Sequence, residues 1–364
     1  MAKKIDIQGI ARSKITSALL VLGLLLLFNL FFTRNFFVIT VMDGHLFGTI
    51  IDILNRGAPL MLLSMGMTLV IASTGGGTDL SVGAIIAITG AMVSRLIGGQ
   101  LIIEGNVQTF VTETPMALAI ALSLLLACGL GLWNGLLVTY GKIQPIVATL
   151  VLMVAGRGIA QLITDGQIIT IYYQPFHFIG SGWLLGLPFT IFIALSVFIL
   201  AMVLTRKTSL GLFAAAVGGN AVASWYAGIN DKAVKLFCFV FSGFCAGAAG
   251  LIVCANIKAS DANNAGLNSE LDAILAAVIG GTSMSGGKFS LAGSLVGALL
   301  IQTLTTTIYS FGVPPEVSLV VKALVVVLVC FLQSSIAADF FGRLSQKLFG
   351  GKGLKTEFKA GGTV

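Results

Sequence analysis

The sequence predicts an all-α polytopic membrane protein with about ten transmembrane helices. Hydrophobic residues make up 57% of the 364 positions and charged residues only 10%, whereas a soluble domain carries about 25% charged residues. The apolar residues fall into runs of about 20, which is the length that crosses a bilayer. Glycine-rich segments interrupt two of these runs, and this pattern predicts broken or re-entrant helices.

The first apolar run covers residues 15–32 and follows a segment rich in Lys and Arg. A secretory signal peptide has the same layout, but it ends in small residues suited to cleavage. This run ends Phe31-Phe32-Thr33-Arg34. We therefore expect an uncleaved first span.

Nine further runs predict spans near residues 50–72, 79–97, 115–140, 145–164, 188–205, 233–256, 271–284, 290–311 and 316–341. The span 271–284 is short, so a re-entrant hairpin and a total of eight or nine spans remain allowed. Prolines fall at or near several span starts, where a missing N–H costs nothing. The expected organisation is one membrane domain over residues 15–341, with tails at 1–14 and 342–364.

The distribution of charge predicts the orientation of the chain. Basic residues lie in both tails, in the loop 206–232 and in the turns with Lys142 and Lys288, whereas the loops 98–114 and 165–187 contain acidic residues without Lys or Arg. Cytoplasmic loops carry the excess of Lys and Arg, so both termini are expected in the cytoplasm. The net charge of +7 is therefore an orientation signal, and no nucleic-acid partner is expected.

No motif indicates catalysis, a metal or a cofactor. The five cysteines lie in apolar segments without a CxxC pattern, which is typical of buried structural cysteines. Residues 282–289 resemble a phosphate-binding loop, but the first glycine of that motif is replaced by Thr282 and Phe289 follows Lys288. An ATP site in this chain is therefore not expected.

Three pairs of glycines four residues apart predict close helix contacts. They are Gly131 with Gly135, Gly243 with Gly247, and Gly293 with Gly297. Small residues at this spacing let helix backbones approach each other closely in lipid. We expect a tightly packed bundle.

The two glycine-rich segments resemble each other. Residues 76–83 read GGTDLSVG and residues 280–287 read GGTSMSGG, identical at five of eight positions. They are either two turns in a glycine-rich chain or parts of a transport pathway built from broken helices. The charge pattern places both near the cytoplasmic ends of their spans, so we expect them near an inner gate.

Polar residues near these segments are the candidates for the pathway wall. A charged side chain at the bilayer centre costs roughly 2.5–3.5 kcal/mol, so it faces protein, water or the interface. Asp79 could instead cap the helix that follows it, and the two roles are compatible. The candidate pathway or gate residues are Asp79, Ser81, Asn134, Asp272, Thr282 and Ser283.

The long basic loop contains a candidate docking helix. Asn220 can cap a short helix over residues 221–227, and Gly228 can end it. Such a helix suits a groove in another protein, although a plain amphipathic surface helix is the alternative. The candidate coupling residues are Gly218, Asn220, Ala223, Ala227 and Gly228.

Several motifs together resemble the permease subunits of bacterial ATP-binding-cassette (ABC) importers of the ribose/galactose, or branched-chain-transport, type. The resemblance covers about residues 35–345 and rests on residues 66–71, 74–83, 133–135, 142–150, 156–158, 218–229 and 270–287. Within this family, residues 43–56 and 260–266 are most similar to the galactofuranose importers.

This resemblance implies the mechanism and the partners. Two permease subunits, identical or related, form a type II ABC importer-like bundle in the bacterial inner membrane. Two cytoplasmic ATPase subunits engage residues 218–228, and a periplasmic sugar-binding protein delivers a monosaccharide such as galactofuranose, ribose or galactose. The chain itself is then a non-enzymatic subunit without a cofactor, in contact with membrane lipid.

Two departures from the family pattern mark this chain. The family usually reads TGGIDLSVG, whereas residues 74–83 are one residue longer and carry Thr78 before Asp79, which is expected to rotate or loosen the start of the following helix. The family's arginine after Gly211 is also absent.

The competing hypothesis is a cation-coupled secondary transporter with Asp79 and Asp272 as ion carriers.

Overall fold

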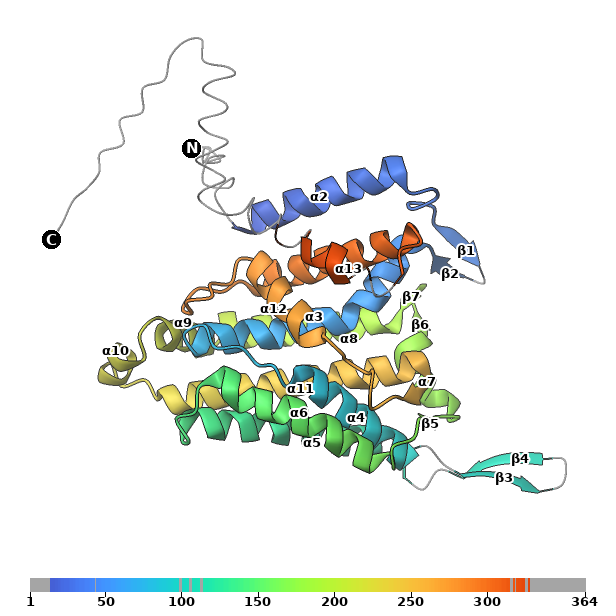
Figure 1. Ribbon diagram of the computed structural model, residues 1–364, viewed down its shortest axis with the longest axis horizontal. Helices are drawn as coiled ribbons and strands as arrows, with labels where there is room; N and C mark the ends of the chain where they lie inside the picture. Colours follow the sequence, from blue (N-terminus) through green and yellow to red (C-terminus); the bar gives the residue numbers. More distant parts are fainter. Residues whose placement is uncertain are drawn as a thin grey trace, which may run out of the picture.

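The long helices follow the predicted spans. The structure, a computed structural model, describes residues 14–42, 44–97, 100–104, 107–111, 114–314, 317, 319–324 and 327. The eight long helices of this part are α2 (Lys14–Phe32), α3 (Thr49–Ser73), α4 (Val82–Ile97), α5 (Met116–Thr139), α6 (Pro145–Ile163), α8 (Phe189–Arg206), α11 (Asp231–Ile257) and α13 (Leu291–Ser310). Each boundary lies within three residues of its prediction, which confirms the all-α polytopic fold (Figure 1).

Six of these helices are long and apolar enough to cross a membrane, namely α3, α5, α6, α8, α11 and α13. The apolar helix Ala18–Phe32 and α4 are shorter. Prolines occupy the starts of α5, α6 and α8 as expected. The tails 1–14 and 342–364 and the predicted span 316–341 lie outside the described residues, apart from Lys14 and a few positions between 317 and 327.

Four shorter helices complete the described part, and one of them corrects a prediction. They are α7 (Gln174–Ser181), α9 (Leu210–Gly219), α10 (Ala221–Tyr226) and α12 (Ser269–Ile279). The predicted span 271–284 is wrong in its extent, because α12 has only 11 residues. A helix of that length rises about 16 Å, roughly half of a bilayer core. The chain then turns through the second glycine-rich segment, as the re-entrant alternative requires.

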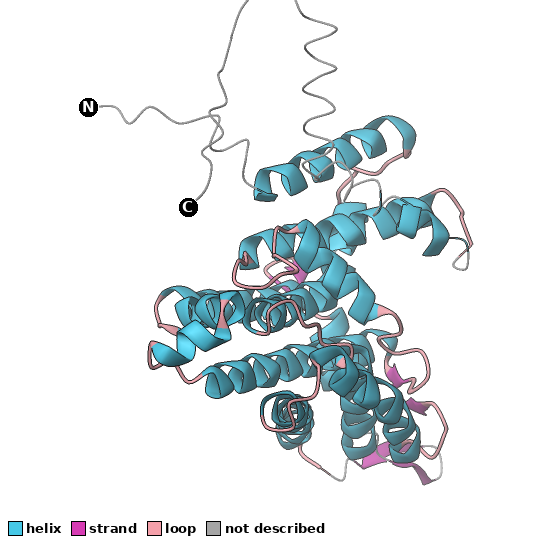
Figure 2. Cartoon of the chain, turned by 60° about the vertical axis from the view of Figure 1, so that its left-hand side comes forward, coloured by secondary structure: helices cyan, strands magenta, loops and turns pink. Residues whose placement is uncertain are grey.

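Four small antiparallel strand pairs lie at one end of the bundle (Figures 1 and 2). They are β1 (Thr40–Met42) with β2 (His45–Phe47), β3 (Gln100–Glu104) with β4 (Val107–Val111), β6 (Trp183–Leu184) with β7 (Leu187–Pro188), and β5 (Ile169–Thr170) with β8 (Ala259–Ser260). The β5–β8 pair aligns Ile169 with Ser260. It therefore joins two connections that are distant in the sequence.

Helix α11 lies at the centre of the bundle, packed against α3, α4 and α5. The predicted glycine pairs make this packing close. A Cβ built on Gly243 would lie 2.4 Å from the Ala127 carbonyl oxygen and 3.0 Å from the Gly131 Cα, and one on Gly297 would lie 2.1 Å from the Ala276 carbonyl oxygen. Only glycine fits at such contacts, so these positions set the spacing of α11 to α5 and of α13 to α12.

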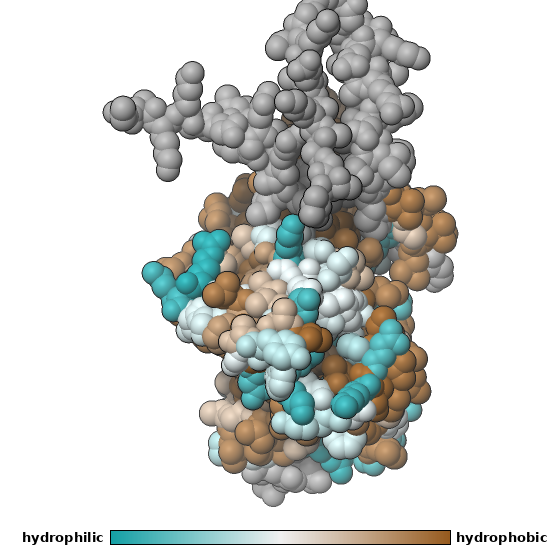
Figure 3. All heavy atoms as spheres, turned by 90° about the vertical axis from the view of Figure 1, so that its left-hand side faces the viewer, coloured by the Kyte–Doolittle hydropathy of each residue, from teal (hydrophilic) through white to brown (hydrophobic). Residues whose placement is uncertain are grey.

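The two ends of the bundle differ in character. The basic turns between α5 and α6, α8 and α9, and α12 and α13 gather at the end opposite the strand pairs, together with the turn between α10 and α11 (Figure 1). Seen from that end, hydrophilic residues cluster on the face and hydrophobic residues cover the flanks (Figure 3). The basic loops and the acidic loops that the sequence predicts on opposite sides of the membrane therefore lie at opposite ends of the bundle.

Candidate functional site

The two glycine-rich segments meet each other at the basic end of the bundle. A Cβ built on Gly76 would lie 1.8 Å from the Met284 carbonyl oxygen, and one on Gly286 would lie 2.5 Å from the Gly75 Cα. Gly76 and Gly286 have φ of 98° and 75°, a region that favours glycine. The similarity between the segments therefore has a structural counterpart, because each supplies backbone that the other contacts.

Helix α9 packs onto the same place. A Cβ built on Gly218 would lie 1.6 Å from the Ala72 carbonyl oxygen and 2.9 Å from the backbone N of Gly287. The Gly287 N–H donates to the same Ala72 oxygen over 3.1 Å. We call Gly75, Gly76, Gly218, Gly286 and Gly287 the glycine junction. Through it the end of α3, the turn after α12, and α9 are in direct backbone contact.

A buried polar cluster lies between the first glycine-rich segment and α11. The Asp79 carboxylate is fully buried and accepts hydrogen bonds from the Ser81 N–H at 3.1 Å, the Ser81 hydroxyl at 2.6 Å and the Ser242 hydroxyl at 2.8 Å. Asn134 Nδ2 donates to the Ser81 hydroxyl over 2.7 Å. These four residues, the Asp79 cluster, tie the start of α4 to α5 and α11.

This geometry refines the predicted cap. Helix α4 begins at Val82, three residues after Asp79, so the carboxylate accepts the N–H that lies just before the helix. Ser242 was absent from the predicted site because it lies 163 residues from Asp79 in the sequence. No sequence pattern marked it.

The additional residue does not loosen the first glycine-rich segment, which is packed in place. Thr78 is buried, and its carbonyl oxygen lies 3.4 Å from the Thr149 hydroxyl, which in turn accepts the Leu80 N–H at 3.1 Å. A Cβ built on Gly77 would lie 2.5 Å from Pro145 Cγ. The first turn of α6 thus holds the longer segment in place.

The remaining pathway candidates lie apart from the Asp79 cluster. Thr282 is buried, with its hydroxyl 3.5 Å from that of Ser294, which lies 2.6 Å from the Thr68 hydroxyl. The Ser283 hydroxyl accepts the Ser285 N–H at 3.2 Å within its own turn.

Asp272 lies apart from both groups. Its carboxylate is paired with Lys322 at 2.9 Å. The structure therefore divides the six candidates among three local environments.

The predicted coupling helix is present and exposed. Asn220 Oδ1 accepts the Ala223 N–H at 2.9 Å, and Gly228, with φ of 81°, follows the end of α10. Ala223 and Ala227 are exposed. Gly218, by contrast, is buried in the glycine junction and presents no surface to a partner.

Three apolar residues that the prediction omitted dominate the exposed face of α10. Val222, Trp225 and Tyr226 are 67%, 63% and 78% exposed. Aromatic side chains anchor many protein interfaces. The sequence carried this signal as a Trp-Tyr pair within a helix of small residues.

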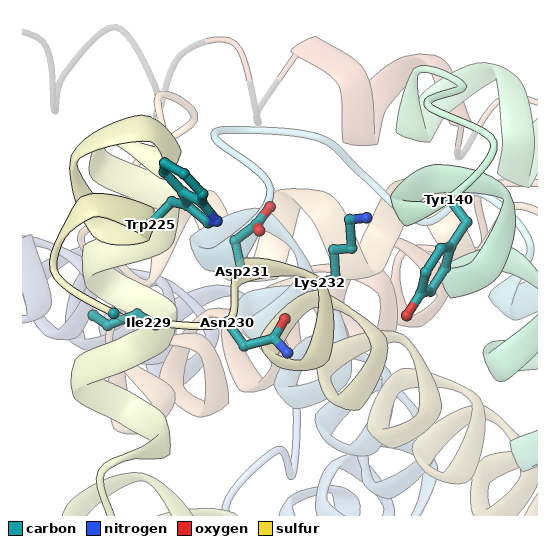
Figure 4. A pocket seen from close by; sticks show the side chains of 7 residues that line it. Tyr140, Trp225, Ile229, Asn230, Asp231 and Lys232 are labelled. Atoms are coloured by element: carbon teal, nitrogen blue, oxygen red, sulfur yellow. The ribbon is translucent and has the colours of Figure 1, made fainter.

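A cavity of about 470 Å³ opens beside α10 (Figure 4). Lys232, at the start of α11, places its Nζ 4.8 Å from the centre of the Tyr140 ring at the end of α5. Trp225 and Asp231 line the same cavity. Within the described part of the chain, no three His, Cys, Asp or Glu side chains lie close enough to hold a metal ion.

A bundle of apolar helices broken by glycine turns, with a short exposed helix at its basic end, defines a polytopic membrane permease. The profile of the family "Branched-chain amino acid transport system / permease component" matches residues 49–330. This chain belongs to that family.

Curated relatives agree over most of the chain. It is 50% identical to the galactofuranose transporter permease protein YtfT of Escherichia coli (strain K12), covering 87% of this chain and 88% of that protein. It is 34% identical to the fructose import permease protein FruF of Bifidobacterium longum (strain NCC 2705), covering 99% of each. It is also 34% identical to the ribose import permease protein RbsC of Escherichia coli (strain K12), covering 81% and 85%. No solved structure matches the chain.

Proposed function

We propose that this chain is the membrane-spanning permease subunit of an ATP-driven importer for a monosaccharide. The observation that carries the proposal is the 50% identity, over 87% of the chain, to a galactofuranose transporter permease. Permeases named for fructose, ribose and L-arabinose are similar as well. The shared substrate class is a neutral sugar. The particular sugar is set by a periplasmic sugar-binding protein, which delivers it to the end that carries the strand pairs.

The energy for transport enters at α10. This helix lies at the basic end, which the positive-inside bias assigns to the cytoplasm, and there an ATPase subunit binds Val222, Trp225 and Tyr226. Helix α9 precedes α10 directly and packs on the glycine junction. Movement of α10 on ATP binding therefore displaces the ends of α3 and α12 through backbone contacts.

The gate lies around the two glycine turns. Asp79, Ser81 and Asn134 hold α4 and α5 together on one side of it, and Thr282 and Ser283 lie on the other. Asp272 holds α12 through its ion pair with Lys322. In this proposal the six residues fix the helix ends that open and close, while a second permease subunit, identical or related, completes the pathway. The assembly lies in the bacterial inner membrane with both termini in the cytoplasm.

The alternative, a cation-coupled secondary transporter, receives less support. An ion carrier needs carboxylates that are free to bind and release a cation. Asp272 already pairs with a lysine at 2.9 Å, and three protein donors occupy Asp79. The relatives are named as sugar permeases.

Gly228→Trp is expected to abolish ATP-driven sugar uptake. The positive φ of 81° strains any larger residue, and an indole at this position would fill the cavity beside α10. Uptake into vesicles that contain the complete importer, compared with the membrane yield of the variant, checks the expectation.

Gly166→Trp is the matched control for backbone strain, because Gly166 has φ of 71° and open space around it at the other end of the bundle. Both variants should reach the membrane in normal amounts. Retained uptake by Gly228→Trp would remove α10 from the coupling mechanism.

A further inference from the structure

A second cavity lies on the flank of the bundle, remote from α10. It has a volume of about 350 Å³ and lies between α4, α6, the connection before α12, and α12 itself. This volume falls at the lower end of the 300–1,000 Å³ that small-molecule sites occupy. Its apolar lining consists of Ala84, Met153, Val154 and Leu267.

Arg157 of α6 forms one polar wall of this cavity. Its Nη1 donates to the backbone carbonyl oxygens of Asn263 at 3.2 Å and Ala265 at 2.5 Å, with Ala262 at 3.4 Å. Among the residues that the structure describes, neither Nε nor Nη2 of Arg157 has a hydrogen-bond acceptor. A guanidinium carries five N–H donors. The guanidinium therefore holds the connection before α12 with Nη1, and the N–H groups on Nε and Nη2 remain available to a ligand in the cavity that Arg157 lines.

Gln161 and Asn263 extend this wall. Gln161 Nε2 donates to Asn263 Oδ1 over 2.5 Å, and both residues line the cavity. The contact uses one group of each amide, so the Gln161 carbonyl oxygen and the Asn263 amino group remain available. The wall thus offers an acceptor beside a donor.

Glu270 of α12 forms the opposite polar wall and is the unexplained feature. Its side chain is 3% exposed, and among the described residues its buried Oε2 atom has no hydrogen-bond partner. A Cβ built on Gly83 of α4 would lie 2.3 Å from this oxygen, so the glycine makes room for it. An unpaired buried acceptor costs about 1–3 kcal/mol, more when charged. Native proteins leave few such groups without a partner.

We infer that this cavity binds a neutral polyhydroxylated molecule, a monosaccharide or a similar polyol, as a stage of its passage through the membrane. Each sugar hydroxyl can donate one hydrogen bond and accept two. It can therefore pair with the free Arg157 and Asn263 donors, and a small rotation of the Glu270 side chain away from Gly83 would bring the buried, unpaired Oε2 atom to the same ligand. The charge of Arg157 is attracted to both Glu270 and Asp261, so the cavity has no excess of positive charge that would select an anionic ligand. The four apolar side chains suit the C–H face of a sugar ring.

The position of the cavity agrees with a passage site. Arg157 lies 12 residues after Pro145 and six before Ile163, which places it about 18 Å and 9 Å from the two ends of α6. The site is therefore within the membrane-spanning length and nearer to the end that carries the strand pairs. This inference rests on the proposed transport of a monosaccharide.

The test combines sugar protection of an engineered cysteine with transport. Val154→Cys, which places a thiol at the cavity, is made in the full chain with the five native cysteines replaced by serine or alanine. Its alkylation by N-ethylmaleimide is followed in lipid nanodiscs with D-galactose, D-ribose, D-fructose or L-arabinose. Val151→Cys is the matched control, because Val151 lies on the same helix and is similarly exposed but does not line the cavity. At least one sugar is expected to slow alkylation of Val154→Cys and none that of Val151→Cys.

Glu270→Gln keeps almost the same side-chain shape and removes the negative charge. Among the described residues, Oε2 has no hydrogen bond that this substitution could break. The substitution should raise the sugar concentration needed for protection about tenfold. This shift corresponds to the smallest contribution that a hydrogen bond to a charged group typically makes. The substitution should also reduce uptake by the complete importer while the amount in the membrane stays normal. If Arg157 and Glu270 only hold the connection, Glu270→Gln will leave both protection and uptake unchanged, and the inference fails.

The inference also fails if no sugar protects Val154→Cys from alkylation. If only anionic phospholipid protects this cysteine, the cavity is a lipid site and the inference fails as well. Failure of the proposed function looks different. In that case the wild-type importer itself shows no ATP-dependent uptake of any of these sugars. Wild-type uptake with unprotected Val154→Cys would overturn the cavity assignment alone.

Discussion

Replacing Asp79 by alanine is expected to abolish transport and to lower the free energy of unfolding by about 2–4 kcal/mol, since it leaves buried donors unpaired. The carboxylate accepts three hydrogen bonds from Ser81 and Ser242. Without it, two hydroxyls and one backbone N–H lose their partner in the interior, and the start of α4 is no longer tied to α11. Thermal unfolding of the purified chain in detergent, together with uptake by the importer, measures both effects.

Asp79→Asn distinguishes a structural role of the Asp79 side chain from a requirement for its negative charge. The asparagine carbonyl oxygen can still accept from Ser81, and its amino group can donate to the Ser242 hydroxyl. A structural role therefore predicts that Asp79→Asn retains most of the stability and uptake that Asp79→Ala loses. An Asn variant as inactive as the Ala variant, at normal stability, would show that the gate requires the negative charge.

Gly218→Val should uncouple α9 from the glycine junction and abolish transport. Even its Cβ would lie 1.6 Å from the Ala72 carbonyl oxygen, a backbone atom that cannot move aside like a flexible side chain. Overpacking typically costs about 1–3 kcal/mol and occasionally more. The expected results are a lower membrane yield and loss of sugar-stimulated ATP hydrolysis in the complete importer.

The neighbouring glycine provides the control. A Cβ on Gly219, the next residue of α9, meets no atom within 4 Å, so Gly219→Val should keep near-normal yield and uptake. Equal behaviour of the two variants would contradict the assignment of Gly218 to the junction.

The long helices were predictable because a bilayer selects apolar runs of nearly constant length. Helices α3 and α5 differ from their predicted spans by one residue at each end. Helix α12 was predicted too long, since the apolar residues around Gly280 and Gly281 do not indicate where a helix ends. The strand pairs were not predicted, because strands of two to five residues leave little periodic signal.

The site was predictable only where its parts are local in the sequence. Asn220 and Gly228 carry the local chemistry of a helix cap and a helix end, and the structure places them at those positions. Ser242 beside Asp79, and Gly218 beside Ala72, depend on how distant helices pack. The similarity of the two glycine-rich segments suggested a shared role, but the sequence did not indicate that they touch.

We propose that this chain is a passive permease driven by a separate ATPase through α10. The most direct measurement uses vesicles that contain the chain, its ATPase subunit and its sugar-binding protein, with labelled D-galactose or D-ribose as the probe. We expect uptake that requires ATP, persists with an uncoupler and is lost with Gly228→Trp. Uptake that survives ATP depletion but disappears with the uncoupler would contradict it and establish an ion-driven transporter.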